Sequence, residues 1–416
     1  MTNILWFTWK DREHPLAGGA EVVTQKLIEG LISDGHTVEC IVGGFKKKVE
    51  GQKLKVKSEK YVEKNGYKIT RLGNRYTVYA LAIFYYFKHL RKKNYDIVID
   101  EVNTAPFFAS WYMRNKNVKH FLFFHQLARE IWFYQMPWFI GWIGYLGEAV
   151  YLRLLSIGSP QVITVSESTK QDLMKYGFRK ENINIISEGL DDDGASIKPI
   201  ELESEKYKVE NIKYKRPTIL SFGAVRAMKR TLEIVKAFEI LKASGATPSI
   251  KESDDLSSRK LSRGFSEKEL ADLRLIIAGD TNDSYARKMI KYIEKSPFKK
   301  DIEVLGRVTA EKKKELMQKS QIIAVTSIKE GWGLIVTEAN SQGTPAVVYD
   351  VDGLRDAVKH DETGLVCQPT PANLAKGIAQ LLQDKEKYDK LRTNAWKWSK
   401  EITFERCYGD FKKSIM

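Results

Sequence analysis

The feature that most constrains the fold is a series of short apolar strands that alternate with helical segments, and this series starts twice along the 416 residues. The strand runs are rich in Val, Ile, Leu and Phe, and most segments between them carry apolar residues at helical spacing. The runs are residues 3–9, 37–42, 96–101, 120–125 and 161–166, and then 218–224, 273–280, 301–306, 322–327 and 345–350. Apolar strands separated by helices form parallel sheets covered on both faces. The sequence therefore predicts an α/β fold of two tandem, doubly wound, Rossmann-like domains.

A polar stretch from about Glu188 to Pro217 separates the two series and is predicted to be the linker between the domains. We accordingly expect an N-terminal domain over residues 1–195 and a C-terminal domain over residues 196–396. Two domains also suit the length, because one ordinary core does not grow to this size. A second polar stretch, residues 244–269, is expected to be a surface insertion.

The chain is strongly basic, with 68 Lys and Arg against 53 Asp and Glu and a net charge of +15. Nucleic acid, anionic lipid and phosphorylated small molecules would all suit this charge, and lysine-rich residues 43–68 also fit a merely solvated surface. No RNA-binding or DNA-binding motif accompanies the charge, so nucleic acid is the least favoured partner.

The three cysteines are far apart and form no CxxC pair, so neither a disulfide framework nor a metal site is expected. The N-terminal residues lack the basic and then apolar pattern of a secretory signal. Both observations favour a cytoplasmic location.

The most apolar segment, residues 131–155, is interrupted by Gln135, Pro137 and glycines, and is therefore too irregular to span a bilayer. Two interpretations stay open. The segment forms a buried helix pair, or it forms an interfacial helix whose Trp132, Trp138 and Trp142 lie at the level of the lipid headgroups.

Ligands of doubly wound sheets bind outside the carboxyl ends of the strands, so the loops after strands are the informative ones, and two facing domains would offer a cleft. After the strand at residues 322–327 comes a turn with Gly331 and Gly333, then a helix. These glycines let the backbone approach a ligand, and free amides at the helix start favour a phosphate. Glu330 before the turn and Glu338 in the helix are suited to accept hydrogen bonds from hydroxyl groups. This arrangement fits a nucleotide sugar, with hydroxyls on both sides of a diphosphate. The spacing alone fits equally well two ordinary glutamates at a helix start and on the surface.

A second candidate site follows the strand that ends near Gly223, where Arg226, Lys229 and Arg230 precede a helix. Cations over a helix start can clamp a diphosphate, and arginine does so with two parallel hydrogen bonds. The alternative is a helix start that is merely basic at the surface.

The first strand of the chain is followed by Gly18 and Gly19, whose amides could approach a phosphate or an acceptor. A plain flexible turn is the alternative. The stretch lacks the GxGxxG pattern of a dinucleotide-binding turn, which counts against an NAD enzyme. His125 ends another apolar strand, and both a satisfied core histidine and a role in the cleft stay open.

Together these stretches resemble the retaining family-4 glycosyltransferases of the GT-B fold, most strongly from Leu220 to Ala379. The family's E-x7-E motif is matched by Glu330 and Glu338. Supporting stretches are GGAE at 18–21, VSESTKQDL at 165–173, LIIAGD at 275–280, VLGRV at 304–308 and HDETGLV at 360–366.

The resemblance implies roles for single residues. Glu330 would face the donor sugar and Glu338 would hold the nucleotide ribose. Lys229 and an arginine would neutralise the diphosphate. The family arginine usually follows the glycine directly, where this chain has Ala224, so Arg226 takes that assignment. The remaining residues are His125, implied beside sugar and acceptor, and the donor-binding Gly18, Gly19, Gly223, Gly331, Trp332, Gly333 and Leu334.

The resemblance also implies the reaction, the transfer of a hexose with retention of configuration to a lipid-linked or glycan acceptor at the cytoplasmic membrane face. A UDP-sugar is favoured as donor, with GDP-mannose next, and peripheral contact with an anionic membrane is expected. The N-terminal domain would lie on the acceptor side, and a last helix at about 397–416 would pack back onto it.

No metal ion or cofactor is expected. Asp191–Asp193 is similar to the DxD metal motif of the other large glycosyltransferase fold, but it falls in the predicted linker. Two alternatives stay open, a nucleotide-sugar 2-epimerase of the same fold and a sugar-nucleotide-binding protein without turnover.

Overall fold

The computed structural model describes residues 1–45, 62–64, 66–113, 117–190, 214–243 and 271–416. The predicted boundary at residue 195, the surface insertion at 244–269 and Asp191–Asp193 lie outside the described residues. Most of the lysine-rich stretch and of the predicted linker also lie outside them.

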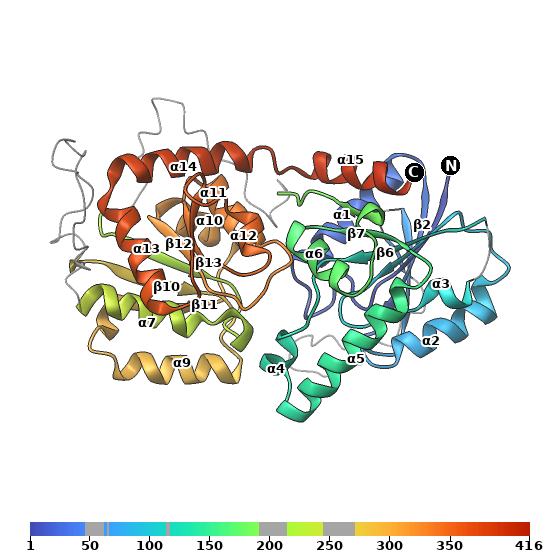
Figure 1. The fold of residues 1–416 in the computed structure, drawn as a ribbon, viewed down its shortest axis with the longest axis horizontal. Helices are drawn as coiled ribbons and strands as arrows, with labels where there is room; N and C mark the ends of the chain where they lie inside the picture. Colours follow the sequence, from blue (N-terminus) through green and yellow to red (C-terminus); the bar gives the residue numbers. More distant parts are fainter. Residues whose placement is uncertain (46–61, 65, 114–116, 191–213, 244–270) are drawn as a thin grey trace. The chain divides into compact units, whose positions relative to one another are not determined.

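The chain divides into two compact units, each built around a parallel sheet with helices on both faces (Figure 1). The first unit contains Met1–Gly189 together with Phe404–Met416, and the second contains Leu190–Thr403. The predicted α/β fold with two doubly wound sheets is confirmed.

The sheet of the N-terminal unit has the strand order β3-β4-β2-β1-β5-β6-β7-β8, and every neighbouring pair is parallel except β3 with β4. The sequence missed β3, β4 and β8, because they are short or continue a charged stretch. The strands are β1 Asn3–Phe7, β2 Thr37–Gly43, β3 Val62–Lys64, β4 Tyr67–Leu72, β5 Ile97–Glu101, β6 Lys119–Phe124, β7 Gln161–Thr164 and β8 Ile183–Ile185.

Successive side chains of a strand point to opposite faces of the sheet. Because the strands of this sheet carry apolar side chains on both faces, helices cover both. Ile4 and Trp6 pack with α1 (Gly19–Ser33) and α15 (Phe404–Ile415). Leu5 and Phe7 belong to a separate core cluster on the opposite face. The helices of that opposite face are α2 (Val78–Tyr85) with its π-helical continuation η1 (Tyr86–Leu90), α3 (Ala109–Tyr112), α5 (Trp138–Ser156) and α6 (Glu167–Lys175).

Helix α15 belongs to the N-terminal unit although it ends the chain. The ring of Phe411 lies 5.7 Å from that of Trp6, and the Tyr408 hydroxyl donates to Asp34 at 2.6 Å. The preceding helix, α14 (Lys385–Ser399), lies in the other unit, so the returning element begins at Phe404 rather than near residue 397.

The sheet of the C-terminal unit has the order β11-β10-β9-β12-β13-β14 and is parallel throughout. Helices α7 (Thr231–Ala243), α9 (Ser284–Lys295) and α13 (Pro371–Gln383) cover one face, and α10 (Ala310–Lys319), α11 (Leu334–Ser341) and α12 (Leu354–Ala357) cover the other. The strands are β9 Thr218–Phe222, β10 Arg274–Ala278, β11 Ile302–Gly306, β12 Ile322–Val325, β13 Ala346–Tyr349 and β14 Gly364–Cys367.

The strand order of each sheet reverses at one point, between β1 and β5 in the first unit and between β9 and β12 in the second. Doubly wound sheets bind ligands outside the carboxyl ends of the strands at such a reversal. The loops after β1, β9 and β12 are therefore the expected ligand-binding loops.

Candidate active site

The loops that follow β9 and β12 are tied together by main-chain contacts. The Ile328 N–H donates to the carbonyl oxygen of Met228 at 2.8 Å. The Thr326 hydroxyl lies 3.0 Å from the carbonyl oxygens of both Lys229 and Arg230. These contacts join two segments about a hundred residues apart, and so position the side chains that each loop carries.

The central pair of the site is Lys229 and Glu330. The Lys229 ammonium group donates to Oε1 of Glu330, and the Ser327 hydroxyl donates to the same oxygen at 2.5 Å. The side chain of Lys229 is 33% exposed and that of Glu330 is 14% exposed, so solvent reaches both. The structure thus unites the two residues that the sequence placed in separate candidate sites.

Two glycines that were not among the predicted site residues make this arrangement possible, although Gly279 lies in the stretch LIIAGD. Gly353 has a φ of +78°, and a Cβ there would lie 2.3 Å from the carbonyl oxygen of Glu330. Gly279 has a φ of +140°, and a Cβ there would lie 1.9 Å from the carbonyl oxygen of Gly223. Any larger residue would push the loops apart, and local sequence patterns do not reveal these contacts because they are made between separate segments.

A pocket lies at the reversal point of this sheet, between the ends of β9 and β12 and the starts of α7 and α11. Gly223 and Lys229 line it, together with the hydroxyl-bearing Ser327 and Thr231. The pocket therefore combines a bare stretch of backbone, a cation and hydrogen-bonding hydroxyls.

The turn before α11 contains the predicted donor-binding residues Gly331, Trp332, Gly333 and Leu334. Gly333, with a φ of +103°, precedes the helix, which begins at Leu334. The first amide groups of a helix have no acceptor within it and can bind an anion. The ring of Trp332 packs 6.0 Å from that of Trp398 on α14.

Glu338 is buried on α11 and is paired with a lysine that the sequence analysis did not select. Its Oε1 lies 2.6 Å from Nζ of Lys313 on α10. Burial raises the pKa of Glu338, and the charge of Lys313 opposes that shift. Lys313 stands in a run of three lysines, so only the tertiary contact distinguishes it from its neighbours.

The two arginines near Lys229 differ in their surroundings. Arg226 precedes the 3-10 turn η5 (Ala227–Lys229), and its side chain is exposed. The guanidinium of Arg230 lies over the Tyr349 ring at 5.1 Å and 3.5 Å from a Glu233 carboxylate oxygen. Arg230 is therefore engaged within the fold, and Arg226 is the better placed to meet a ligand.

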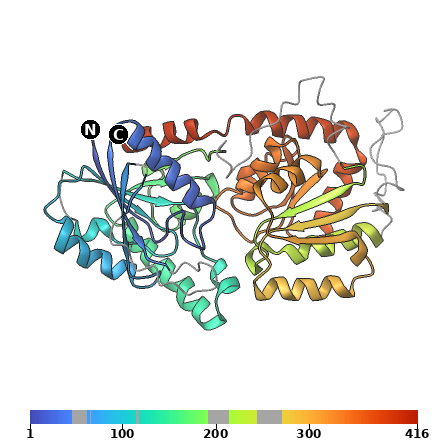
Figure 2. The ribbon, with the colours of Figure 1, turned by 180° about the vertical axis from the view of Figure 1, so that it is seen from behind.

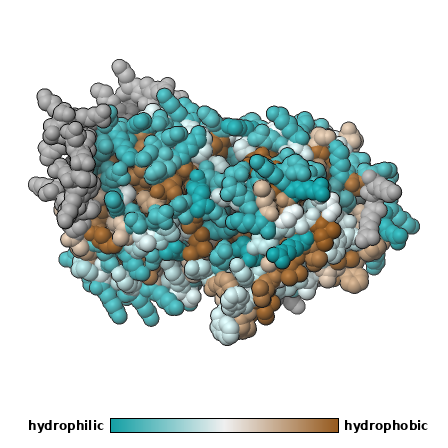
Figure 3. Space-filling model, viewed as in Figure 1, coloured by the Kyte–Doolittle hydropathy of each residue, from teal (hydrophilic) through white to brown (hydrophobic). Residues whose placement is uncertain are grey.

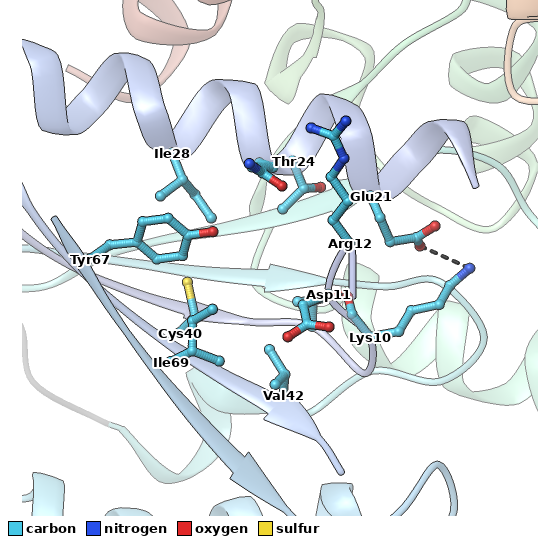
Figure 4. Close-up of a pocket in the computed structure, with 12 residues that line it drawn as sticks. Lys10, Asp11, Arg12, Glu21, Thr24, Ile28, Cys40, Val42, Tyr67 and Ile69 are labelled. Carbon is cyan, nitrogen blue, oxygen red and sulfur yellow. Dashed lines mark hydrogen bonds and ion pairs between the residues drawn. The ribbon is translucent and has the colours of Figure 1, made fainter. Parts of the chain in front are cut away.

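In the N-terminal unit, Gly18 precedes α1 and Gly19 is its first residue. The Gly18 N–H donates to a carboxylate oxygen of Glu21 at 2.6 Å, and Lys10 lies 2.9 Å from the other oxygen. A pocket opens here with charged groups at one end, including Lys10 and Arg12, and apolar groups such as Tyr67 at the other (Figure 4). Gly18 and Gly19 belong to the N-terminal unit, and the pocket at Lys229 belongs to the C-terminal unit.

His125 follows β6 and is buried, with 6% of its surface exposed. Its Nε2 lies 3.5 Å from Oε1 of Glu101, and its ring lies 4.4 Å from that of Phe123. Burial acts to lower the pKa of His125, but the carboxylates of Glu101, Glu188 and Glu21 outweigh it and the pKa is raised. The imidazolium form is therefore favoured by a carboxylate-rich interior.

Glu188 stands where the linker was predicted to begin, and the two units divide directly after it, between Gly189 and Leu190. The structure buries its side chain in the N-terminal unit, with 4% of its surface exposed. Burial raises the pKa of Glu188 to about 7, while the charge of His125 and the Gly189 N–H act to lower it. Within the described part of the chain, its Oε2 is buried without a hydrogen-bond partner.

The described residues contain no group of three or more His, Cys, Asp or Glu placed to hold a metal ion.

Two family models match the chain. The model described as Glycosyltransferase Family 4 matches residues 17–193, and the model described as Glycosyl transferases group 1 matches residues 203–398.

Two relatives illustrate how far the sequence similarity extends. The chain is 23% identical over 414 residues to an uncharacterised glycosyltransferase of Methanocaldococcus jannaschii, covering 92% of this chain and 89% of that protein. It is 46% identical over 68 residues to the D-inositol 3-phosphate glycosyltransferase of Corynebacterium efficiens, covering 16% of each.

Solved structures agree in fold. Sucrose-phosphate synthase from Thermosynechococcus elongatus has a TM-score of 0.71 at 16% identity, covering 99% of this chain and 98% of that chain. HepE of Anabaena, solved with UDP-glucose, has a TM-score of 0.66 at 15% identity, covering 100% and 99%. With two matching family models, a relative along nearly its whole length and this shared architecture, the chain belongs to the family-4 glycosyltransferases of the GT-B fold.

Proposed function

We propose that the protein is a retaining glycosyltransferase that moves a hexose from a nucleotide sugar to a lipid-linked or glycan acceptor at the cytoplasmic membrane face. The observation that carries this proposal is the pairing of Lys229 with Glu330 at the carboxyl edge of the C-terminal sheet. There a cation for phosphate and a carboxylate for sugar hydroxyls lie in direct contact.

The chemistry that this site has to assist is the departure of a nucleoside diphosphate. Negative charge grows on the leaving phosphate as its bond to the anomeric carbon breaks, and fixed cations and amides lower that barrier. We assign this role to Lys229, with the exposed Arg226 and the amides of Gly331–Leu334 completing the anion site. The Lys229 ammonium group is paired with the Glu330 carboxylate. This pairing holds the ammonium group at the position where we expect the leaving phosphate to bind.

The two glutamates of the motif take different roles in this proposal. Glu330, partly exposed at the mouth of the turn, accepts hydrogen bonds from the donor sugar. Glu338, whose charge Lys313 offsets, binds the ribose hydroxyls. Neither acts as a covalent nucleophile, and the cations work without a metal ion or cofactor.

In the N-terminal unit we assign acceptor and sugar binding to His125 and to the backbone at Gly18 and Gly19. The carboxylate of Glu101 holds the imidazole of His125 and favours its charged form. A charged imidazolium carries an N–H on both ring nitrogens, so the nitrogen that does not face Glu101 suits a hydroxyl or phosphate oxygen of an acceptor.

We expect a UDP-sugar to raise the midpoint of thermal unfolding more than a GDP-sugar or an ADP-sugar does. HepE of Anabaena, which shares this fold, was solved with UDP-glucose, and this supports the uridine donor. A ligand at a hundred times its Kd stabilises the folded state by about 2.7 kcal/mol. The measurement is a thermal-shift screen of the three donor classes. A Glu338→Gln variant, which keeps the side-chain shape, should respond less, and a protein that no nucleotide sugar stabilises would contradict the proposal.

The product of transfer should keep the anomeric configuration of the donor. Proton NMR of the product made from an α-linked UDP-hexose shows this directly in the anomeric coupling constant. A product with inverted anomeric configuration would contradict the retaining mechanism but would still show that the protein transfers sugar. Release of a free epimerised sugar or nucleotide sugar would instead indicate the 2-epimerase, and binding without any product would indicate a non-catalytic protein.

A further inference from the structure

Helix α5 is apolar on the side that faces solvent as well as on the side that faces the sheet. Its inward residues include the buried Leu152 and Leu155. The outward residues recur at helical spacing and are exposed, with Trp138 at 75% and Ile143 at 69%. The full exposed set on this helix is Trp138, Phe139, Ile140, Trp142, Ile143, Leu146, Val150 and Leu154. A surface helix normally places polar residues there, so this face is built for something other than water.

Buried contacts on the inner side of α5 hold the helix with this apolar face outward. The carboxylate of Glu148 on α5 accepts hydrogen bonds from the Arg129 N–H at 2.6 Å and from the Trp132 ring at 3.1 Å. Gly144 leaves room for that ring, since a Cβ there would lie 2.4 Å from it. Trp132 of α4 (Ile131–Gln135) is therefore an internal brace rather than a headgroup anchor. Of the three tryptophans considered, Trp138 and Trp142 are the exposed ones.

A second helix adds apolar side chains on the same side of the sheet. Leu81, Phe84 and Phe87 of α2 and η1 are exposed, Phe84 by 72%. Both α2 and α5 cover the same sheet face, and Figures 1 and 2 show them on one side of the N-terminal unit. In Figure 3 apolar side chains gather over α5 at the surface.

The exposed charge on these two helices and in the segments that flank α2–η1 is positive. Residues 75–93 contain five Lys and Arg (Arg75, Lys88, Arg91, Lys92 and Lys93) and no Asp or Glu. On α5 the charged residues are the buried Glu148 and the exposed Arg153. The exposed apolar side chains thus adjoin cations, without an exposed carboxylate on either helix.

We propose that the outer faces of α2–η1 and α5 form one docking surface for an anionic lipid bilayer. We name it the α2–α5 face and define it by Leu81, Phe84, Phe87, Trp138, Phe139, Trp142, Ile143, Leu146 and Val150, with Lys88, Arg91 and Lys92 as its cations. Aromatic side chains favour the headgroup level of a bilayer, and neighbouring Lys and Arg bind anionic headgroups. No described helix is both long and apolar enough to cross a membrane.

A bilayer fits this surface better than a second copy of the chain does. In a two-fold dimer the same patch meets itself, so Lys88, Arg91 and Lys92 would approach their own copies. Like charges at an interface oppose association, whereas anionic lipid neutralises them. This inference deepens the membrane part of the proposed function. It rests on the proposed function only for the biological purpose of the membrane contact.

The test is sedimentation of the full chain with vesicles, without donor or acceptor. Vesicles of phosphatidylcholine mixed with phosphatidylglycerol should retain the protein at low salt, and pure phosphatidylcholine should retain far less. Changing Phe84, Trp138 and Ile143 to serine should weaken partitioning by roughly tenfold for each side chain. These side chains are exposed, so the fold should persist, as circular dichroism and the thermal midpoint would check.

The electrostatic part has its own variant. Changing Lys88, Arg91 and Lys92 to glutamate should lower binding to the anionic vesicles by roughly a hundredfold or more and remove its salt dependence. The matched control changes the exposed lysines 288, 291 and 295 of α9 to glutamate, with the same change in net charge. A matched apolar control is Ile240→Ser, since Ile240 on α7 is 42% exposed.

Equal loss in the α9 control would overturn the proposal, because net charge alone would then explain binding. Unchanged vesicle binding of either α2–α5 variant would also overturn it. The same holds if the protein does not bind vesicles but forms a dimer in sedimentation equilibrium, and the serine changes dissociate that dimer. Failure here leaves the reaction standing, because donor hydrolysis or transfer to a water-soluble acceptor is measured without lipid.

Discussion

A Lys229→Met variant is expected to transfer sugar roughly 100- to 1,000-fold more slowly than the unchanged protein. Lys229 is the cation that the loop after β9 holds against Glu330, and methionine keeps its length while removing the charge. The leaving diphosphate would lose its main counter-charge and would also face an unopposed Glu330. The measurement is kcat and kcat/KM for release of nucleoside diphosphate in the presence of acceptor.

The control for this experiment is Lys236→Met. Lys236 lies on α7 in the same unit and pairs with Glu233 at 3.1 Å, so it matches Lys229 in chemistry but lies outside the proposed anion site. The Lys229→Met/Glu330→Gln double variant separates catalysis from structure. If the pair only stabilised the loops, the double variant would regain turnover, and that result, or full activity of Lys229→Met, would remove the site assignment.

Raising the pH through about 7 is expected to destabilise the N-terminal unit, and a Glu188→Gln variant is expected to resist this change. The pKa of Glu188 is raised by burial to about 7 in the folded protein, above its value of roughly 4.3 in an unfolded chain. The stability that comes from its bound proton is complete below the unfolded pKa and is lost as the pH rises through the folded one. The difference is on the order of 3 kcal/mol well above pH 7.

His125 contributes in the same direction, because its pKa is also raised in the folded state and its proton is lost on the alkaline side. Glutamine at position 188 keeps the shape and removes the titration, so the pH dependence should become shallower. Thermal midpoints from about pH 5 to about pH 9 measure this. Glu181→Gln, at an exposed position of the same unit, should follow the unchanged protein, and parallel curves for all three proteins would refute the assignment.

Local patterns predicted much of the fold. Alternating short apolar runs and helical segments require parallel sheets, because only helices on both faces can cover strands that are apolar on both sides. The main strands after which the candidate residues stand were predicted for this reason. The strands β3, β4 and β8 were missed, since they carry too few apolar residues for a periodic signal.

The same local logic reached part of the candidate site. Glu330, Gly331, Gly333 and Glu338 were selected because a strand, a glycine turn and a helix follow each other there. Lys313 was not selected, because nothing in a run of lysines distinguishes the one that faces Glu338.

The sequence alone determined the two sheets, the turn at Glu330 and the family to which the chain belongs. Only the tertiary structure decided that Lys229 reaches Glu330, that Glu188 is buried near His125 and that the apolar outer side of α5 faces solvent. Periodicity records which residues are apolar within one segment, whereas these three results depend on contacts with segments far away in the chain. In a helix that is apolar all round, as α5 is, no local pattern says which side remains uncovered.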